Sequence, residues 1–124
     1  MANDYDMKAR NAMVDALAAL GVRIALHTGD PGGADSATNE VTGGSYARGT
    51  CAWDAAGSPT PGAAFLADDV SIAVPAGNTV TYISVWNSAG TSRYLKKSVT
   101  SEAFGADGTY IVDSATTTLD LNDA

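Results

Sequence analysis

The sequence predicts a mainly β protein: an antiparallel β-sandwich or a jelly-roll-like barrel, preceded by one α-helix. About eight short segments with strand-like patterns are separated by turns rich in Gly, Pro, Asn and Asp. The chain has 13 glycines and only 17% charged residues, which favours a turn-rich β protein over a helical bundle. Its 124 residues fit one domain, 1–124, with a helix at 4–20 and a sandwich at 22–121 that includes a long loop at 28–45.

The N-terminal segment has the period of a helix. Apolar residues spaced by three or four positions share one face, which we expect to be buried: Ala9, Met13, Ala16, Leu17 and Leu20. Asn3 is the expected N-cap, followed by Asp4 and Asp6 in the first turn, and Gly21 is the expected C-terminal stop. Because the alanines are small, we expect this helix to lie closely on a sheet or on a neighbouring subunit.

After Gly21 the period changes to that of strands. The segment 22–28 alternates, with Ile24 and Leu26 on one face and Ala25 and His27 on the other, which is typical of a half-buried strand. Further strands are predicted in this order: 45–53, a short one ending at Leu66, 70–74, 79–87, 93–100, 109–112 and 116–121. The segment 79–87 is the expected central strand, with both faces covered.

Charge and cysteine content restrict the partners. The net charge is −7 and only seven residues are Lys or Arg, so we expect no free nucleic acid as partner. A small basic group consists of Arg93, Lys96 and Lys97.

Cys51 is the only cysteine and is expected to be a buried structural thiol. No signal peptide or apolar membrane span is visible, so we expect folding in a cytoplasm and no membrane partner.

Catalytic motifs are not recognisable. His27 and Asp30 with one of the serines could form a hydrolytic triad, but "GGSYA" does not match the G-x-S-x-G turn of a nucleophilic serine. We therefore expect no enzyme activity and interpret His27 as a surface or subunit-contact histidine.

Metal and phosphate sites are also not predicted. Asp30, Asp35 and Glu40 lie in one loop and could supply oxygens to Ca²⁺, but their spacing does not match a calcium-binding loop. The loop glycines are not followed by the lysine of a Walker loop, so we interpret them as residues that allow positive φ. We expect no cofactor and no metal.

Several aromatic residues could form a sugar-binding platform: Tyr46, Trp53, Tyr82, Trp86 and Tyr94. More often such residues belong to the core and rim of a sandwich. A glycan- or receptor-binding module that uses exposed aromatics near Trp86 and Tyr94 stays open as an alternative function.

The loop 28–45 and the alanine-rich helix favour a protein that works by assembly. Loops of this length are uncommon in compact domains unless they are functional or disordered. We expect Asp30, Pro31 and Gly32 to start a turn, Gly43 and Gly44 to end the loop, and Arg48 to pair with Glu40 as the chain returns to the sheet. The loop between would lie against another subunit and become ordered on that contact. The subunit-contact candidates are Asp30, Pro31, Gly32, Glu40, Gly43, Gly44, Tyr46 and Arg48.

Three segments carry a resemblance to a known family: "ALHTGDPG" (25–32), "NEVTGGSYAR" (39–48) and "VPAGNTVTYISVWNSAGTSRYL" (74–95). In this order, over about residues 4–121, they resemble small virion proteins of tailed bacteriophages described as tail-fibre-like or minor tail proteins. The chain departs from the family pattern in the hairpin "SAGTS", where a serine follows the threonine in place of a glycine.

The resemblance implies a non-enzymatic structural component of the virion, a minor tail or tail-fibre-like protein assembled in the host cytoplasm. Its expected partners are other virion proteins and further copies of itself. A head decoration protein that stabilises capsomer junctions is the nearest alternative.

Overall fold

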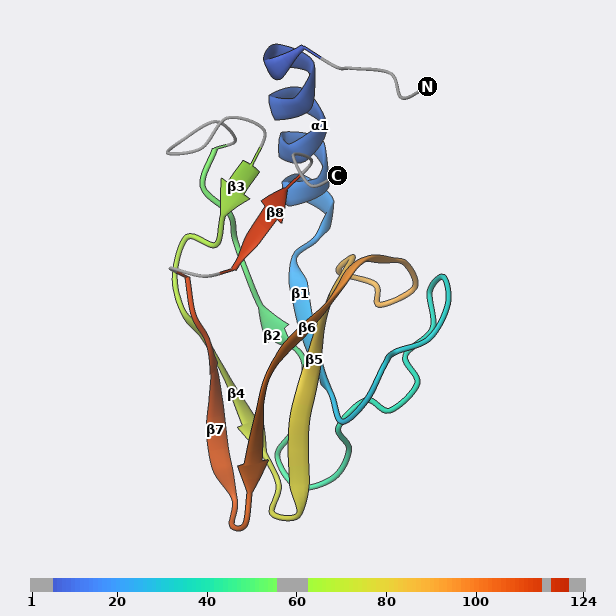
Figure 1. The fold of residues 1–124 in the computed structure, drawn as a ribbon, viewed down its shortest axis with the longest axis vertical. Helices are drawn as coiled ribbons and strands as arrows, with labels where there is room; N and C mark the ends of the chain where they lie inside the picture. Colours follow the sequence, from blue (N-terminus) through green and yellow to red (C-terminus); the bar gives the residue numbers. More distant parts are fainter. Residues whose placement is uncertain (1–5, 56–62, 115–116, 121–124) are drawn as a thin grey trace.

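The computed structural model describes residues 6–55, 63–114 and 117–120, and these ranges contain one helix and eight strands (Figure 1). The elements are α1 (Met7–Leu20), β1 (Arg23–His27), β2 (Gly49–Thr50), β3 (Ala63–Phe65), β4 (Val70–Val74), β5 (Asn78–Trp86), β6 (Arg93–Phe104), β7 (Gly108–Val112) and β8 (Thr118–Asp120). All strand pairs are antiparallel. The predicted fold class, mainly β with one N-terminal helix, is confirmed.

The strands form one sheet and two ribbons. The sheet has the order β2-β1-β5-β6, and the ribbons are β3–β8 and β4–β7. Short turns connect β4 to β5 and β6 to β7, so the β4–β7 ribbon lies beside β5 and β6 at the end of the molecule opposite α1 (Figure 1). Apolar side chains from both layers form one core, among them Ile24, Leu26, Val70, Ile72, Val74, Val80, Ile83, Val85, Tyr110 and Val112. The arrangement is sandwich-like, and β5 is the interior strand that the sequence predicts.

The two layers approach closely on one side and separate on the other. An added Cβ at Gly49 of β2 would lie 2.5 Å from Val70 Cγ1 and 3.0 Å from Ile72 Cγ1, so the glycine lets β4 contact β2. On the other side, residues 97–102 of β6, residues 110–112 of β7 and the following Asp113 line an open groove of about 520 Å³. The sandwich is therefore closed at β2 and β4 and open between β6 and β7.

The ends of α1 differ from the prediction. The helix begins at Met7 after Asp6, whose side chain makes no capping hydrogen bond, and the expected cap Asn3 lies outside the described residues together with Asp4. Gly21 ends the helix as expected, but with φ −85° instead of a left-handed conformation. A Cβ on Gly21 would lie 2.6 Å from Val85 Cγ1, so this position needs glycine for close packing.

The predicted buried face of α1 is confirmed at Leu17 and wrong at Met13, Ala16 and Leu20. The helix packs on the β3–β8 ribbon through Val14, which is fully buried against Ala64, with Leu17 and Ala18 beside it. Met13 and Leu20 from the predicted face remain 36% and 51% exposed. An alanine-rich helix has apolar residues on more than one side, so periodicity alone did not identify the side that the narrow ribbon covers.

Two strand predictions also need correction. The segment predicted as a strand at 45–53 contains only the two-residue β2 and an isolated bridge between Trp53 and Leu66. The first strand, β1, is buried on both faces and not on one, since Ala25 and His27 are both 0% exposed. The loop 28–45 contributes to this burial, because its Thr38 carbonyl oxygen lies 3.0 Å from Nδ1 of His27.

Cys51 is a buried structural thiol, as predicted. Its side chain is buried, and Sγ donates to the backbone carbonyl of Gly21 at 3.4 Å. Burial raises the pKa of the Cys51 thiol to about 11, so the thiol stays protonated at neutral pH. Among the described residues, no helix combines the length and the apolar character that a membrane crossing requires.

Candidate functional site

The loop 28–45 begins with the predicted turn. Asp30 Oδ1 accepts a hydrogen bond from the backbone N–H of Gly32 at 2.9 Å, and Gly32 has φ +93°. Pro31 between them is buried. An aspartate that bonds the N–H two residues ahead is a common turn device, and glycine accepts the positive φ without strain. The turn at Asp30, Pro31 and Gly32 is confirmed.

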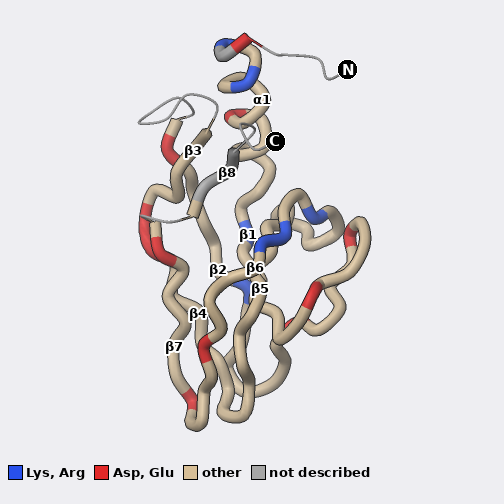
Figure 2. Tube along the Cα trace, in the orientation of Figure 1, with Lys and Arg blue, Asp and Glu red and all other residues tan. Residues whose placement is uncertain are grey.

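The first half of the loop is held by the start of β6. The Arg93 guanidinium donates to the carbonyls of Gly32, Gly33 and Ser36, and the Arg93 N–H donates to Asp35 Oδ1 at 2.8 Å. Lys96 Nζ donates to Asp30 Oδ1 at 2.8 Å. Figure 2 shows the basic residues at the start of β6 beside the acids of this loop. The expectation that the loop becomes ordered only against another subunit is therefore corrected: its own domain orders it.

The second half of the loop ends in a charged network. Arg48 Nε and Nη2 donate to the two carboxylate oxygens of Glu40 at 2.9 and 2.8 Å, a bidentate pair, and the Tyr46 hydroxyl donates to Oε2 at 2.7 Å. The Tyr46 oxygen also accepts from the N–H of Leu26. The Arg48 guanidinium lies 4.2 Å from the centroid of the Trp86 ring, a cation–π contact. The predicted pair of Arg48 with Glu40 is confirmed.

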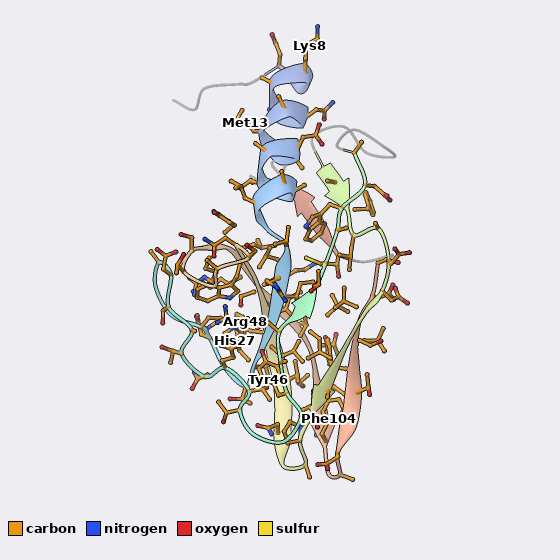
Figure 3. All side chains as sticks on the ribbon, turned by 180° about the vertical axis from the view of Figure 1, so that it is seen from behind. Lys8, Met13, His27, Tyr46, Arg48 and Phe104 are labelled. Carbon is orange, nitrogen blue, oxygen red and sulfur yellow. The ribbon has the colours of Figure 1, made fainter. Side chains whose placement is uncertain are left out.

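The electrostatics of this network favour its charged form. Burial alone would raise the pKa of Glu40, but the hydrogen bonds from Arg48 and Tyr46 hold the pKa below its ordinary value. Burial is also the main cause of the raised pKa of Tyr46, so its hydroxyl stays a donor at any physiological pH. The network joins the end of the loop to β1 and β5 through Leu26 and Trp86. Figure 3 labels Tyr46 and Arg48 of this network, with His27 between them.

The loop acids do not converge on a common point. Asp30 bonds Lys96, Asp35 bonds the backbone of β6, and Glu40 bonds Arg48. In the described part of the chain, no group of three or more Asp, Glu, His or Cys side chains is arranged to hold a metal ion.

His27 is buried, and its interpretation as a surface or subunit-contact residue is wrong. Nδ1 lies 3.0 Å from the carbonyl oxygen of Thr38, and Nε2 lies 2.7 Å from Ser84 Oγ. Trp86 Nε1 donates to the same Ser84 oxygen at 2.7 Å. The neutral tautomer with a proton on Nδ1 satisfies all of these groups, because Ser84 can then donate to Nε2 and accept from Trp86.

This histidine and serine do not form an accessible catalytic pair. Both residues are 0% exposed, and Nδ1 of His27 faces a backbone carbonyl where a triad would place a carboxylate. Asp30, the third member considered from the sequence, bonds Lys96 instead. The pair fixes the loop to the sheet, because His27 joins Thr38 of the loop to Ser84 of β5.

The aromatic residues do not form the platform that a glycan module would need. Trp86 is only 2% exposed and lies under Arg48, and Trp53 Nε1 donates to the carbonyl of Gly21 at 2.8 Å. The alternative of a glycan module that uses exposed aromatics near Trp86 is therefore not supported, because Trp86 belongs to the core. Tyr46, Tyr82 and Tyr94 are each partly buried.

A comparison with protein families identifies the chain. The model of the family described as podophage GP4 fiber I protein gp80 matches residues 6–120, almost the whole length. The chain belongs to this family. No curated protein and no solved structure matches it. The predicted resemblance to small virion proteins of tailed phages is thus confirmed, and the protein is a virion component of the fibre class.

In this fibre protein, the eight subunit-contact candidates lie in two groups. Asp30, Pro31 and Gly32 form the turn beside β6, and of these only Asp30 is exposed. Glu40, Tyr46 and Arg48 form the half-buried network, and the exposed Gly43 and Gly44 lie between Glu40 and Tyr46, with φ +94° and +53°.

Three residues that position the loop were not found as a site from the sequence. Arg93 appeared there only as part of a small basic group, and Ser84 and Thr38 were not recognised at all. The basic group of Arg93, Lys96 and Lys97 indicated that hydrogen-bond acceptors lie nearby, but not which segment supplies them. The contact of Ser84 with His27 could not be predicted from a local pattern, because 57 residues separate them in the chain.

The buried histidine predicts a pH dependence of stability. Burial lowers the pKa of His27 in the folded state below its ordinary value of 6.5, against opposing contributions from the Thr38 carbonyl and Glu40, while Arg48 and Arg93 add to the lowering. The unfolded chain therefore binds a proton more readily, and stability is full above the unfolded pKa and falls as the pH drops below it. We expect the urea midpoint to decrease between about pH 7.5 and 5.5. His27→Gln should flatten this dependence, and an unchanged slope in that variant would exclude His27 as its cause.

Proposed function

We propose that this protein is a minor tail or tail-fibre component of a tailed phage that acts through subunit contacts and carries no catalytic centre. The family match over residues 6–120 carries the proposal. The partners would be other virion proteins and further copies of the chain. The word fibre in the family description favours the tail over a head decoration role.

We further propose that the loop 28–45 supplies one of the contact surfaces. The loop is fixed before any partner binds, because Arg93 and Lys96 hold its first half and the Glu40–Arg48 pair holds its second half. A surface that is already ordered loses little conformational entropy on binding. Ala34 in the loop and Ala47, two residues after its end, are exposed.

The test is incorporation into virions. Ala34→Arg places a bulky charge on the loop and Ala47→Arg places one directly after it. Neither removes a side-chain hydrogen bond, so we expect the purified variants to fold normally. We expect phage that carry them to contain clearly fewer copies of the protein per particle, measured by gel densitometry against the major capsid protein. Ala89→Arg, an exposed position in the hairpin between β5 and β6, is the matched control.

Normal incorporation of both variants would exclude the loop and the residues directly after it as a contact surface. The copy number per wild-type particle, measured in the same way, distinguishes a tail protein from a head protein. A copy number far below that of the capsid protein agrees with a tail fibre, and a number comparable to it would favour the decoration role.

A further inference from the structure

β7 is an edge strand that no other described strand covers. It pairs with β4 on one side, and its other side faces the groove beside β6. Figure 1 shows β6 and β7 diverging from the turn that joins them. An edge strand presents a row of backbone N–H and C=O groups without ladder partners. One wall of the groove therefore consists of a strand edge that can pair with a further strand.

Most other strand edges in the described ranges are short or covered. β2, β3 and β8 contain two, three and three residues. The helix α1 packs on β3 and β8, and β4 contacts β2 at Gly49. Short edge strands and covering elements are devices by which proteins prevent unwanted strand pairing. β7, with five residues, has no such cover from the described elements.

β6, on the other side of the groove, is protected by its own sequence. Residues 98–102 of β6 face only residues 80–82 of β5, so the ladder is irregular there. Lys97 and Glu102 add charges at the two ends of the β6 segment that lines the groove. A bulge and charged side chains both disfavour the addition of a strand. A strand in the groove is therefore expected to pair with β7 and not with β6.

The sequence of β7 contains neither protective feature. It reads Gly-Thr-Tyr-Ile-Val, without charge or proline, and its pairing with β4 is regular over all five residues. Ile111 lines the groove and is 48% exposed, although it is a large hydrophobic residue. A regular, apolar edge is a risk for aggregation, and this protein limits that risk at its other edges. This contrast indicates that the edge of β7 is covered by a partner in the assembled particle.

The groove fits an extended peptide segment. Its volume of about 520 Å³ lies within the range of roughly 300–1,000 Å³ that is typical of binding pockets. Only another strand can pair with the β7 backbone in a continuous row. Because side chains alternate along a strand, every second side chain of the segment would lie on the buried residues Ile83, Tyr110 and Val112. These positions of the segment need apolar residues.

The charges of the groove favour a basic segment. One cation and two carboxylates line the groove in the described ranges, Lys97, Glu102 and Asp113, which gives a net charge of −1 on a chain of net charge −7. Lys97 and Asp113 already have partners within the chain. Glu102 is exposed, and burial together with its nearby carboxylate raises the pKa of Tyr110. A cation of the segment would therefore find its counter-ion at Glu102.

We propose that the edge of β7 binds an extended segment of another virion protein as an added strand. The segment lies in the groove beside β6, has apolar side chains at alternate positions, and carries Lys or Arg near Glu102. This inference rests on the proposed function, because it takes the partner from the virion. It concerns a different surface from the loop 28–45.

Hydrogen exchange tests whether the β7 backbone gains hydrogen bonds. The exchange of residues 108–112 is measured by mass spectrometry in the purified protein and in intact particles. We expect at least about fivefold slower exchange in the particles, because an added strand protects the N–H groups that point away from β4. Unchanged exchange in the particles would overturn the proposal.

A photo-reactive residue identifies the occupant. Thr100 is exposed on β6 and lines the groove, and it is replaced by p-benzoylphenylalanine in phage particles. After irradiation, we expect a cross-link to a segment of another virion protein in which apolar residues alternate with polar or basic ones. A cross-link to a second copy of this chain, a cross-link to a segment without this alternation, or no cross-link would each overturn the proposal.

Ile111→Lys and Ser71→Lys form a matched pair of variants. Ile111 and Ser71 are both exposed and lie opposite each other in the β4–β7 ribbon, but only Ile111 lines the groove. We expect both purified variants to fold normally, and only Ile111→Lys to lower the cross-link yield at Thr100, at least several-fold. Equal yields for the two variants would overturn the proposal. Absence of the protein from wild-type particles would overturn the proposed function as well, whereas its presence with unchanged exchange at β7 overturns only this inference.

Discussion

Replacing Arg48 with alanine is expected to destabilise the protein by about 2 to 3 kcal/mol, the largest effect that we predict for one side chain. The substitution leaves the carboxylate of Glu40 half-buried without its bidentate partner and removes the cation from the face of Trp86. Removing one member of a fully buried ion pair costs roughly 3–5 kcal/mol. Both side chains here keep some contact with water. We therefore expect a loss at or below about 3 kcal/mol, the lower end of that range. Urea denaturation at neutral pH measures it.

A second ion pair of the same loop serves as the control. Lys96 and Asp30 also meet at 2.8 Å, but their side chains are 39% and 57% exposed. Because solvent screens such a pair, we expect Lys96→Ala to leave the urea midpoint nearly unchanged. A double-mutant cycle of Arg48→Ala with Glu40→Gln should give a coupling energy above about 1 kcal/mol. Equal losses for Arg48→Ala and Lys96→Ala would show that burial does not distinguish the two pairs.

The parts of the fold that the sequence predicts are those set by local patterns. Val70, Ile72 and Val74 alternate with more exposed residues, and the structure contains β4 at these positions. The turn at Asp30 and Gly32 also follows from neighbouring residues alone. The prediction was wrong for most of the buried face of α1 and for the second face of β1, because each depends on which distant segment covers it. For β1 that segment is the loop 28–45, and no property of residues 23–27 indicates it.

In the candidate site too, local contacts were predictable and contacts between distant segments were not. The pair of Glu40 and Arg48 was predictable, because opposite charges eight residues apart flank a double-glycine turn. The anchor formed by Arg93 was not, since about sixty residues separate its guanidinium from the carbonyls of Gly32 and Gly33. A fixed polar loop and a mobile one have similar compositions. The difference depends on contacts that form only after the sheet has brought β1 and β6 into place.

Replacing Gly49 with alanine is expected to cost about 2 kcal/mol, because overpacking of a dense core typically costs roughly 1–3 kcal/mol. The new methyl group would lie 2.5 Å from Val70 Cγ1, a branched side chain in the core that cannot move aside freely. To admit the methyl group, β4 would have to move away from β2 and open the closed side of the sandwich. The midpoint of urea denaturation measures the loss.

Gly33→Ala is the matched control for this substitution. A Cβ at Gly33 would meet no atom within 4 Å, and the residue is exposed in the loop. The same chemical change there reduces the freedom of the unfolded chain, so we expect stability to be unchanged or raised by up to about 1 kcal/mol. If Gly49→Ala were as stable as Gly33→Ala, the contact between β2 and β4 would not be tightly packed. Packing at Gly49 would then not explain why the sandwich is closed at β2 and β4 and open between β6 and β7.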